Sequence, residues 1–356
     1  MNTLSASRIK LAKQCSWQYW CRYVLKLPDK GNDGSSRGWI VHLVLELLAH
    51  PKRHNYYNKI IKLGSVLADA PLNKLILYHA KKLNVADEEN LALIDAMALN
   101  GLTFDFYGDR NKKPTEVLTE KKFDLTINEG DLNYKVLGFI DKLFLYDDGT
   151  ALIRDFKTSK QVFKGGDITD NLQDLIYCLA TKKLYPEVKT VNCEFLFLKF
   201  PLEIDMVGQP SKGVCQMEEI SNEELDGFEY QLTDAQRYLD NFTEVTALSN
   251  MAAVKGYPKD GTFGGPLVCG REGFKKIRGE EVLDAEGNPI PSYICPYRQP
   301  QDYYVLLNKD GKIIKSAFQD CREDLVSDES KGESVELRHY KGCPHWNKEI
   351  KDDFDL

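Results

Sequence analysis

The spacing of apolar residues changes once along this chain, near residue 115, and that change constrains the fold more than any other feature. Before it, apolar side chains recur at helical spacing in the stretches 9–23, 38–48, 56–63, 71–83 and 87–99. After it, the spacing is that of strands at 117–125, 132–141, 151–157 and 191–198, with a helix at 171–184. This order predicts an α/β fold: a central mixed sheet flanked by helices, with a helical N-terminal portion.

Two local expectations follow from these patterns. We expect one helix from Ser5 or Ser7 to Leu27, ended by Pro28, and then a polar loop over 29–37. The run Asp147-Asp148-Gly149-Thr150 predicts a hairpin with a type I′ turn.

A length of 356 residues suggests roughly two domains of about 150 residues each. The composition shifts near Asn250 toward Gly, Pro and short strand-like runs such as 303–307. We therefore predict a first domain over 1–250, in which residues 1–115 are helical and residues 116–250 form the core. A β-rich C-terminal appendage of unknown role would cover 251–356.

Composition excludes several classes of protein. Apolar residues make up 42% and charged residues 28%, as in soluble globular proteins, and no apolar run is long enough for a membrane helix. The N-terminus lacks the apolar stretch of a signal peptide, and nine cysteines are an odd, scattered set. We therefore expect the reducing cytoplasm, or the host cytoplasm if the protein is viral. A net charge of -7 argues against nucleic-acid binding by bulk electrostatics, although a local basic groove would still permit it.

Two acidic residues carry the strongest chemical signal. Asp141 ends the run Gly138-Phe139-Ile140-Asp141, and Asp155 lies 14 residues later on a strand expected to pair with it through the hairpin. Carboxylates are the oxygen ligands that Mg²⁺ or Mn²⁺ prefers, and Lys157 shares a strand face with Asp155. A metal ligand beside an ammonium group suits phosphodiester hydrolysis. The alternative is an exposed strand edge with a weak surface ion pair.

At this point the sequence resembles the PD-(D/E)XK nucleases, within them the RecB/AddB-like and CRISPR-associated exonuclease branch. The matching blocks occur in the family's order over about residues 4–200: Leu4–Pro28, Gly38-Trp39-Ile40-Val41-His42, Gly138–Asp141 with Asp155-Phe156-Lys157-Thr158, and Leu172-Gln173-Asp174-Leu175-Ile176-Tyr177. Ser16 stands where the family usually has Pro after Cys15. The resemblance implies a restriction-endonuclease-like core and a metal-dependent nuclease.

The resemblance also implies roles for individual residues. His42, Asp141, Asp155 and the Phe156 carbonyl would bind Mg²⁺ or Mn²⁺, and Lys157 would help to activate water. Gln173 and Tyr177 share a helix face and would contact the site, although helix–sheet packing explains them equally well. For His42 the alternative is a buried helix histidine. Glu46 and Glu120 are near enough in the pattern to reach the metals, but we do not include them.

Cysteine spacing bears on a second cofactor. Several relatives hold a [4Fe–4S] cluster through one cysteine in the opening helix and three close together near the C-terminus. Here Cys15 matches the first, but the candidates Cys269, Cys295, Cys321 and Cys343 are 26, 26 and 22 residues apart. A cluster could be held by Cys15, Cys269, Cys295 and Cys343, but we favour folding without one, because closing such gaps costs entropy. A zinc site with His345 is a weaker alternative.

The function expected is that of a Mg²⁺- or Mn²⁺-dependent deoxyribonuclease, an exonuclease of DNA recombination, repair or replication. Alternatives are a nucleic-acid-binding or assembly module with the same fold, and a nuclease acting on RNA. Basic residues offer a track for the substrate or, equally, a solvated surface: Lys10, Lys13, Arg22, Lys26, Lys160, Lys164, and the group Arg271, Lys275, Lys276 and Arg278.

Overall fold

The structure is a computed structural model that describes residues 1–29, 31–163, 171–254, 266–270, 273–274, 276–277, 280–283, 287–290 and 292–347. Lys164, Arg271, Lys275 and Arg278 of the expected basic track lie outside these residues. The chain forms two compact units: Met1–Ala6 with Gly31–Arg237, and Ser7–Lys30 with Tyr238–Leu356. A domain boundary near residue 250 stays a prediction.

A five-stranded mixed sheet is the centre of the first unit. Its order is β1-β2-β3-β4-β5, with bounds Glu116–Glu129, Leu132–Leu145, Thr150–Lys157, Thr190–Phe197 and Val214–Gln216. Only β3 and β4 are parallel, and helix α8 (Leu172–Leu184) lies between them in sequence. Parallel neighbours require such a crossover. The predicted mixed α/β core is confirmed.

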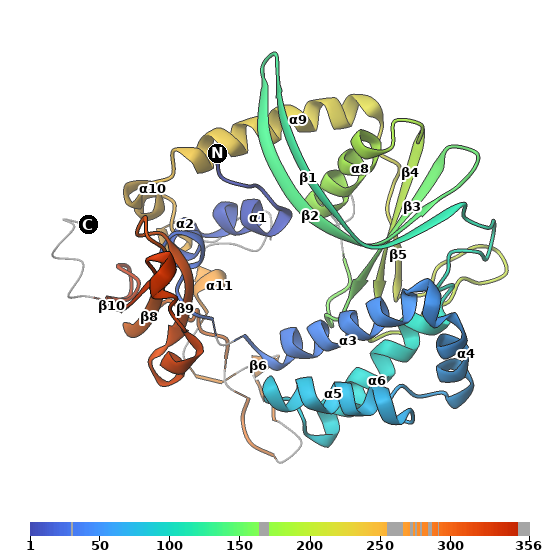
Figure 1. Cartoon of the computed structure of the whole chain (residues 1–356), viewed down its shortest axis with the longest axis horizontal. Helices are drawn as coiled ribbons and strands as arrows, with labels where there is room; N and C mark the ends of the chain where they lie inside the picture. Colours follow the sequence, from blue (N-terminus) through green and yellow to red (C-terminus); the bar gives the residue numbers. More distant parts are fainter. Residues whose placement is uncertain are drawn as a thin grey trace. The chain divides into compact units, whose positions relative to one another are not determined.

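Helices cover both faces of this sheet (Figure 1). On one face lie α3 (Asp33–Ala49), α4 (His54–Leu63), α5 (Ala70–Lys82) and α6 (Glu88–Thr103). Their apolar sides form one buried cluster with Phe156, Leu196 and Val214 of the sheet. On the other face lie α8 and α9 (Asn222–Asp240), where the Tyr134 hydroxyl donates to Glu229 Oε1 at 2.5 Å. Of the predicted helical N-terminal portion, α3 to α6 thus cover the sheet, whereas Ser7–Lys30 belongs to the second unit.

The start of α3 corrects one expectation. The polar stretch 29–37 is not a loop throughout, because α3 already begins at Asp33. Asn32 caps the helix by accepting from the Ser35 amide at 3.0 Å, and the Ser35 hydroxyl accepts from the Asn32 amide at 3.0 Å. This reciprocal pair is a capping box, whose polar residues resemble a loop in sequence.

The first helix was expected to be continuous, and this is wrong. It consists of α1 (Ala6–Gln14), α2 (Ser16–Tyr19) and a π-helical turn over Trp20–Val24. The break is at Cys15, which has extended backbone angles (φ -155°, ψ 107°). There the Ser16 amide donates to the Asn250 carbonyl at 3.4 Å, so a tertiary contact replaces a helical one, and the Ser16 hydroxyl donates to the Ala247 carbonyl at 2.6 Å. Periodicity cannot detect such a break, because the apolar spacing is kept.

The hairpin between β2 and β3 is present, but its turn is not type I′. A type I′ turn requires positive φ at both central residues, and here only Gly149 has it (φ 79°). The Gly149 amide donates to the Tyr146 carbonyl at 3.4 Å, and the Tyr146 amide donates to the Thr150 carbonyl at 3.0 Å. The loop therefore has three residues, and left-handed Gly149 closes it.

The second unit contains the β-rich portion of the chain, as predicted. Strands β8 (Gln301–Leu307), β9 (Ile313–Phe318) and β10 (Ser334–Tyr340) form an antiparallel sheet in the order β10-β8-β9. Short elements accompany it: α10 (Glu244–Ser249), α11 (Pro266–Cys269), β6 (Lys276–Ile277) and β7 (Glu280–Glu281). The unit has its own apolar core, in which Trp17 donates to the Tyr340 hydroxyl at 2.8 Å. In the portion of the chain that is described, no helix combines the length and apolar character needed to cross a membrane.

Gly138 gives a first testable expectation. It pairs with Phe123 across β1 and β2, and a Cβ atom added at Gly138 would lie 2.2 Å from the Phe123 ring. Phe123 is buried and contacts Tyr177, so its ring has little room to move. We expect Gly138→Ala to lower the free energy of unfolding by about 1–3 kcal/mol, measured by urea denaturation.

Gly227, in α9, provides the matched control. Nothing lies within 4 Å of the position of its added Cβ, so Gly227→Ala should raise the free energy of unfolding by about 0.5–1 kcal/mol. In Gly138→Ala, a second change, Phe123→Leu, should restore some of the lost stability. Equal stability of Gly138→Ala and the wild-type protein would contradict the packing argument.

Candidate active site

The predicted acidic residues meet where β2 and β3 run side by side. Lys142 pairs with Arg154 in the antiparallel register, so Asp141 and Asp155 lie at neighbouring positions of the two strands. The Phe156 amide donates to Asp141 Oδ2 at 2.7 Å, which holds the Asp141 carboxylate against β3. The expected convergence of the two strands is therefore present in the geometry.

Helix α3 brings His42 to the same place. Gly38, one turn before His42, faces Thr158 so closely that an added Cβ would lie 2.7 Å from the Thr158 hydroxyl oxygen. The missing side chain lets α3 approach the end of β3. This contact explains why a glycine precedes the histidine, and it joins two of the sequence blocks in space.

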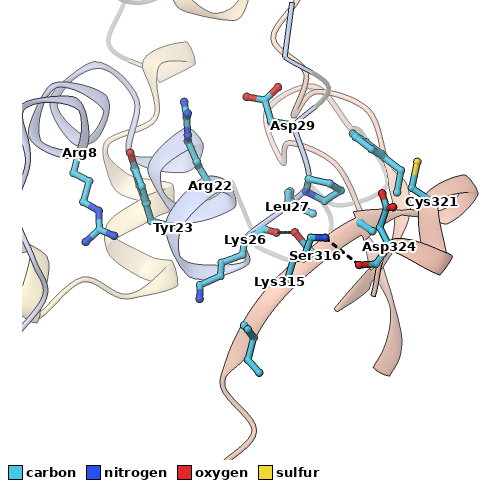
Figure 2. Close-up of a pocket in the computed structure, with 14 residues that line it drawn as sticks. Arg8, Arg22, Tyr23, Lys26, Leu27, Asp29, Lys315, Ser316, Cys321 and Asp324 are labelled. Carbon is cyan, nitrogen blue, oxygen red and sulfur yellow. Dashed lines mark hydrogen bonds between the residues drawn. The ribbon is translucent and has the colours of Figure 1, made fainter. Parts of the chain in front are cut away.

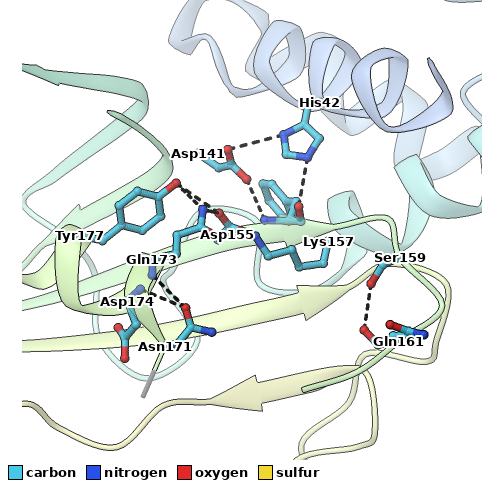
Figure 3. A network of polar contacts seen from close by, with 11 residues as sticks. His42, Asp141, Asp155, Lys157, Ser159, Gln161, Asn171, Gln173, Asp174 and Tyr177 are labelled. Atoms are coloured by element: carbon cyan, nitrogen blue, oxygen red, sulfur yellow. Dashed lines mark hydrogen bonds and ion pairs between the residues drawn. The ribbon is translucent and has the colours of Figure 1, made fainter. Parts of the chain in front are cut away.

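Both ring nitrogens of His42 face acceptors from the sheet (Figure 3). His42 Nε2 lies 3.0 Å from the Phe156 carbonyl oxygen, and Nδ1 lies 3.5 Å from Asp141 Oδ1. The His42 side chain is about one-third exposed, so it is not a fully buried core histidine. Three of the four predicted metal-ligating groups thus lie together: His42, Asp141 and the Phe156 carbonyl.

Asp155 makes a separate set of contacts beside them (Figure 3). Its Oδ2 lies 2.6 Å from Lys157 Nζ, and its Oδ1 accepts from Gln173 Nε2 at 2.7 Å. Gln173 Oε1 in turn accepts from Lys157 Nζ at 2.7 Å, and the Tyr177 hydroxyl lies 3.4 Å from Asp155 Oδ1. Gln173 and Tyr177, four residues apart on α8, therefore contact the acidic strand and not only the sheet's apolar surface.

Glu120 is the residue that sequence reasoning left out. Single donor atoms of His42, Glu120 and Asp141 all lie within 4.8 Å of one another, which makes this group a candidate metal site. Glu120 lies between the paired positions Thr119–Lys142 and Lys121–Ile140, hence opposite Asp141. The position of Glu120 could have been predicted from the turn between Glu129 and Leu132. Counting paired residues back from that turn places Glu120 opposite Asp141. Glu46 is exposed and outside the group, although its charge acts on Glu120.

Glu120 also has an unusual backbone. Its φ is 47°, in the left-handed region that a non-glycine residue rarely adopts. Strain of this kind gathers at functional sites, where the surrounding structure holds it in place. Here the chain neighbours of Glu120 on β1, Thr119 and Lys121, are held by their pairs with Lys142 and Ile140 on β2.

The carboxylates at this site repel one another. Burial, then repulsion by Asp141, raises the pKa of Glu120 to about 7. Burial also raises the pKa of Asp155, with a further contribution from Asp141 and opposition from Lys157. Burial alone would lower the pKa of His42, but its hydrogen bond with Asp141 and the surrounding carboxylates raise it to about 9. The group thus holds more negative charge than its own cations neutralise.

The residues fit a divalent cation. They offer carboxylate oxygens, an imidazole nitrogen and a main-chain carbonyl, a donor set that suits Mg²⁺ or Mn²⁺. Asp155 Oδ2 is buried and makes no hydrogen bond within the described structure, although Lys157 is its ion-pair partner. A cation would relieve the repulsion that raises the pKa of Glu120.

A family model agrees with this geometry. Residues 3–262 match the model of the PD-(D/E)XK nuclease superfamily. The chain belongs to this superfamily. It is therefore a nuclease, a hydrolase of phosphodiester bonds, with a restriction-endonuclease-like core, as the sequence resemblance implied.

Individual proteins show weaker likenesses to this PD-(D/E)XK nuclease. The crystal structure of a candidate exonuclease from Eubacterium rectale is 9% identical, with a TM-score of 0.41, and the match covers 71% of this chain and 86% of that one. The large ribosomal subunit protein uL11 of Ureaplasma urealyticum is 28% identical over 105 residues, which are 28% of this chain and 70% of that protein. Both likenesses are too distant or too short to add to the family assignment.

In the second unit of the nuclease, five cysteines that are distant in the sequence share one core. The four candidate cluster ligands Cys15, Cys269, Cys295 and Cys343 are buried in the same apolar cluster, and so is Cys21. Cys321 is partly exposed and belongs to a different cluster. The wide sequence spacing, on which the preference for folding without a cluster was based, does not keep the four thiols apart.

Proposed function

We propose that this nuclease hydrolyses DNA with Mg²⁺ or Mn²⁺ bound by His42, Asp141, Asp155 and the Phe156 carbonyl, with Glu120 as an added ligand. The observation that carries the proposal is the meeting of His42, Glu120 and Asp141 beside the Asp155–Lys157 ion pair. A nucleic-acid substrate follows from the family; DNA, the choice of metal and a role in recombination, repair or replication are our proposals.

Each residue has a distinct role in the reaction. The metal supplies Lewis-acid activation of the phosphate and of water. Lys157 holds the attacking water by hydrogen bonding and offsets the charge that develops on the phosphate oxygens. Gln173 and Tyr177 position Asp155 and Lys157 through the contacts described above. The water oxygen would form a bond to phosphorus in line with the leaving 3′ oxygen while the P–O3′ bond breaks. One product keeps a 5′-phosphate, and the other has a 3′-hydroxyl, whose oxygen takes up the proton lost by the water.

The test compares end-labelled single-stranded DNA, duplex DNA and RNA in Mg²⁺, Mn²⁺ or chelator. We expect DNA products with 5′-phosphate ends, formed only with a divalent ion, and terminal mononucleotides or short oligonucleotides if the enzyme is an exonuclease. Faster cleavage of RNA than of DNA would indicate a ribonuclease instead. Binding with no cleavage under either ion would favour the alternative of a binding or assembly module.

Glu120 gives a pH-dependent expectation for the metal-free protein. Its folded pKa of about 7 lies above the ordinary glutamate value, so the folded state is disfavoured when the group is ionised. That loss of stability is present above pH 7 and disappears as the pH falls below the unfolded pKa, about 4.3. In chelator, Glu120→Gln should therefore raise Tm by about 2–4 °C above pH 8, with little change near pH 4.

Two comparisons test that expectation. Glu116→Gln, on the same strand but exposed, should leave Tm unchanged at both pH values. With Mn²⁺ added, the wild-type protein should gain more in Tm than Glu120→Gln, because a metal ligand has been removed. A Glu120→Gln variant that melts lower than wild type at high pH without metal would contradict the repulsion argument.

As a second proposal, against the expectation from sequence spacing, we propose that Cys15, Cys269, Cys295 and Cys343 bind an iron–sulfur cluster, because all four are buried in one core. Each of these thiols has a hydrogen-bond donor beside it. The Ala252 amide donates to Cys15 Sγ at 3.4 Å, and Gln18 Nε2 donates to Cys295 Sγ at 3.2 Å. The Trp346 side chain hydrogen-bonds Cys269, and the His345 amide hydrogen-bonds Cys343. Such donors to sulfur are among the features that tune these clusters. Burial raises the pKa of Cys343 to about 12, so a cluster would displace thiol protons.

Anaerobic purification with iron analysis and absorption near the 400 nm region tests the cluster. About four irons per chain, lost in Cys15→Ser but kept in Cys321→Ser, would support it. A colourless protein with iron-free thiols would restore the expectation of folding without a cluster. We also propose a reducing, cytoplasmic location, on the ground that the nine cysteines are an odd number spread widely along the sequence.

A further inference from the structure

The charged residues of the N-terminal segment are all of one sign. Residues 1–28 contain five lysines and arginines and no aspartate or glutamate, in a protein whose net charge is -7. The segment from Ser7 to Lys30 belongs to the second unit, so its charges are not those of the metal site. The metal site therefore does not account for these positive charges.

Three of these cations line one pocket of the second unit. It has a volume of about 480 Å³, and Arg8, Arg22 and Lys26 contribute to its wall together with Lys315 of β9. Two carboxylates, Asp29 and Asp324, also line it, which leaves an excess of two positive charges among the lining residues. We call this the basic pocket. Figure 2 shows Arg8, Tyr23, Arg22 and Lys26 presented from the N-terminal segment, and Lys315 and Asp324 from the C-terminal region.

The Tyr23 ring lies among these cations. The Arg8 guanidinium lies 4.8 Å from the centre of the Tyr23 ring, and that of Arg22 lies 5.9 Å from it. Tyr23 is partly exposed, and Arg22 and Lys26 are exposed. Flat guanidinium and phenol groups provide stacking surfaces for bases, while the same cations bind phosphates.

The local backbone fixes these side chains. Arg22 and Tyr23 lie on the π-helical turn Trp20–Val24, a geometry that is rare and often found at functional sites. Lys26 follows with a left-handed φ of 50°. Its carbonyl accepts from the Ser316 hydroxyl, and its ammonium donates to the Ile313 carbonyl, so β9 holds it at both ends. A merely solvated lysine would not require a strained and doubly anchored backbone.

We propose that the basic pocket binds a single-stranded segment of nucleic acid, with Arg8, Arg22 and Lys26 contacting successive phosphates and Tyr23 stacking on a base. A single strand is favoured over a duplex because only unpaired bases expose a face to the ring. The proposal deepens the nuclease function, from which it takes the class of ligand, but it concerns binding in the second unit and not the chemistry at the metal site.

The experiment measures binding of the full chain to a fluorescent oligothymidylate by anisotropy, in chelator so that no cleavage occurs. For Arg22→Ala/Lys26→Ala we expect about tenfold weaker binding at low salt, and a slope of log affinity against log salt that is shallower by about 1.4, since each lost phosphate contact of a single strand removes about 0.7. Tyr23→Ala should weaken binding about fivefold or more, and Tyr23→Phe should bind normally. Asp324→Asn should tighten binding, by about two- to fivefold.

Lys309→Ala is the matched control, because Lys309 is an exposed cation of the same unit that does not line the pocket. It should bind the oligonucleotide as the wild-type protein does. Equal losses in Lys309→Ala and Arg22→Ala/Lys26→Ala, or an unchanged salt slope in the latter, would overturn the proposal. So would an equal loss of affinity for blunt duplex DNA, which would remove the preference for single strands. Since no cleavage is measured, a failure of the metal-site proposal leaves this result readable.

Discussion

Asp155→Asn is expected to reduce DNA cleavage by about 10³-fold or more while the protein stays folded. The substitution removes a proposed metal ligand and the 2.6 Å ion-pair partner of Lys157, so both the cation and the ammonium group lose their positions. The amide has the same shape as the carboxylate and can still accept from Gln173. Cleavage rates at saturating Mn²⁺, with the melting temperature measured in parallel, would show the effect.

Asp174→Asn is the matched control for that variant. Asp174 is also a buried carboxylate of the first unit, but its contacts are the thiols of Cys178 and Cys193. We expect it to keep cleavage within a few-fold of wild type. Asp155→Asn activity within tenfold of wild type would show that the metal site lies elsewhere.

Arg154→Met is expected to have the largest effect on stability. Arg154 is fully buried on the opposite side of β3 from Asp155, and its guanidinium contacts Glu194 Oε1 at 2.6 Å and Asp105 Oδ2 at 3.0 Å. Removing the cation leaves the buried Glu194 carboxylate without its ion-pair partner and leaves Asp105 with the Arg110 amide alone, which costs about 3–5 kcal/mol. Urea unfolding of the two proteins at one pH gives the difference directly.

The double variant Arg154→Met/Glu194→Gln separates lost charge pairing from lost packing. If the cost comes from an unpaired carboxylate, the double variant should be more stable than Arg154→Met alone. Arg154→Lys should not restore stability, since an ammonium cannot reach both carboxylates in the way that the planar guanidinium does. If the urea midpoint of Arg154→Met equals that of the wild-type protein, this account is contradicted.

The core of the fold could be predicted because its signals are local. Strands and helices follow from periodicity, and the closeness of Asp141 and Asp155 follows from one hairpin. Lys157 faces Asp155 because strand side chains alternate, and Gln173 and Tyr177 share a helix face. These relations hold over short distances in sequence.

What could not be predicted depends on contacts between distant segments. At the helix break, the Ser16 amide and hydroxyl donate to the carbonyls of Asn250 and Ala247, and Ala247 is 231 residues away in the sequence. The meeting of Cys15 with Cys343 likewise needs the finished core of the second unit. Glu120 is different, because the register of the β1–β2 hairpin was readable in the sequence and places it opposite Asp141.

The hydrogen bond between Trp17 and Tyr340 joins residues 323 positions apart, and this has a consequence for biosynthesis. At about 5–20 residues per second, the ribosome would release the segment around Trp17 roughly tens of seconds before its packing partner exists. Throughout that interval Trp17, Tyr19 and two cysteines, Cys15 and Cys21, have no core to enter. Nascent chains of this nuclease should therefore be clients of holding chaperones early in translation, and should fold their second unit only after the segment around Tyr340 has been synthesised.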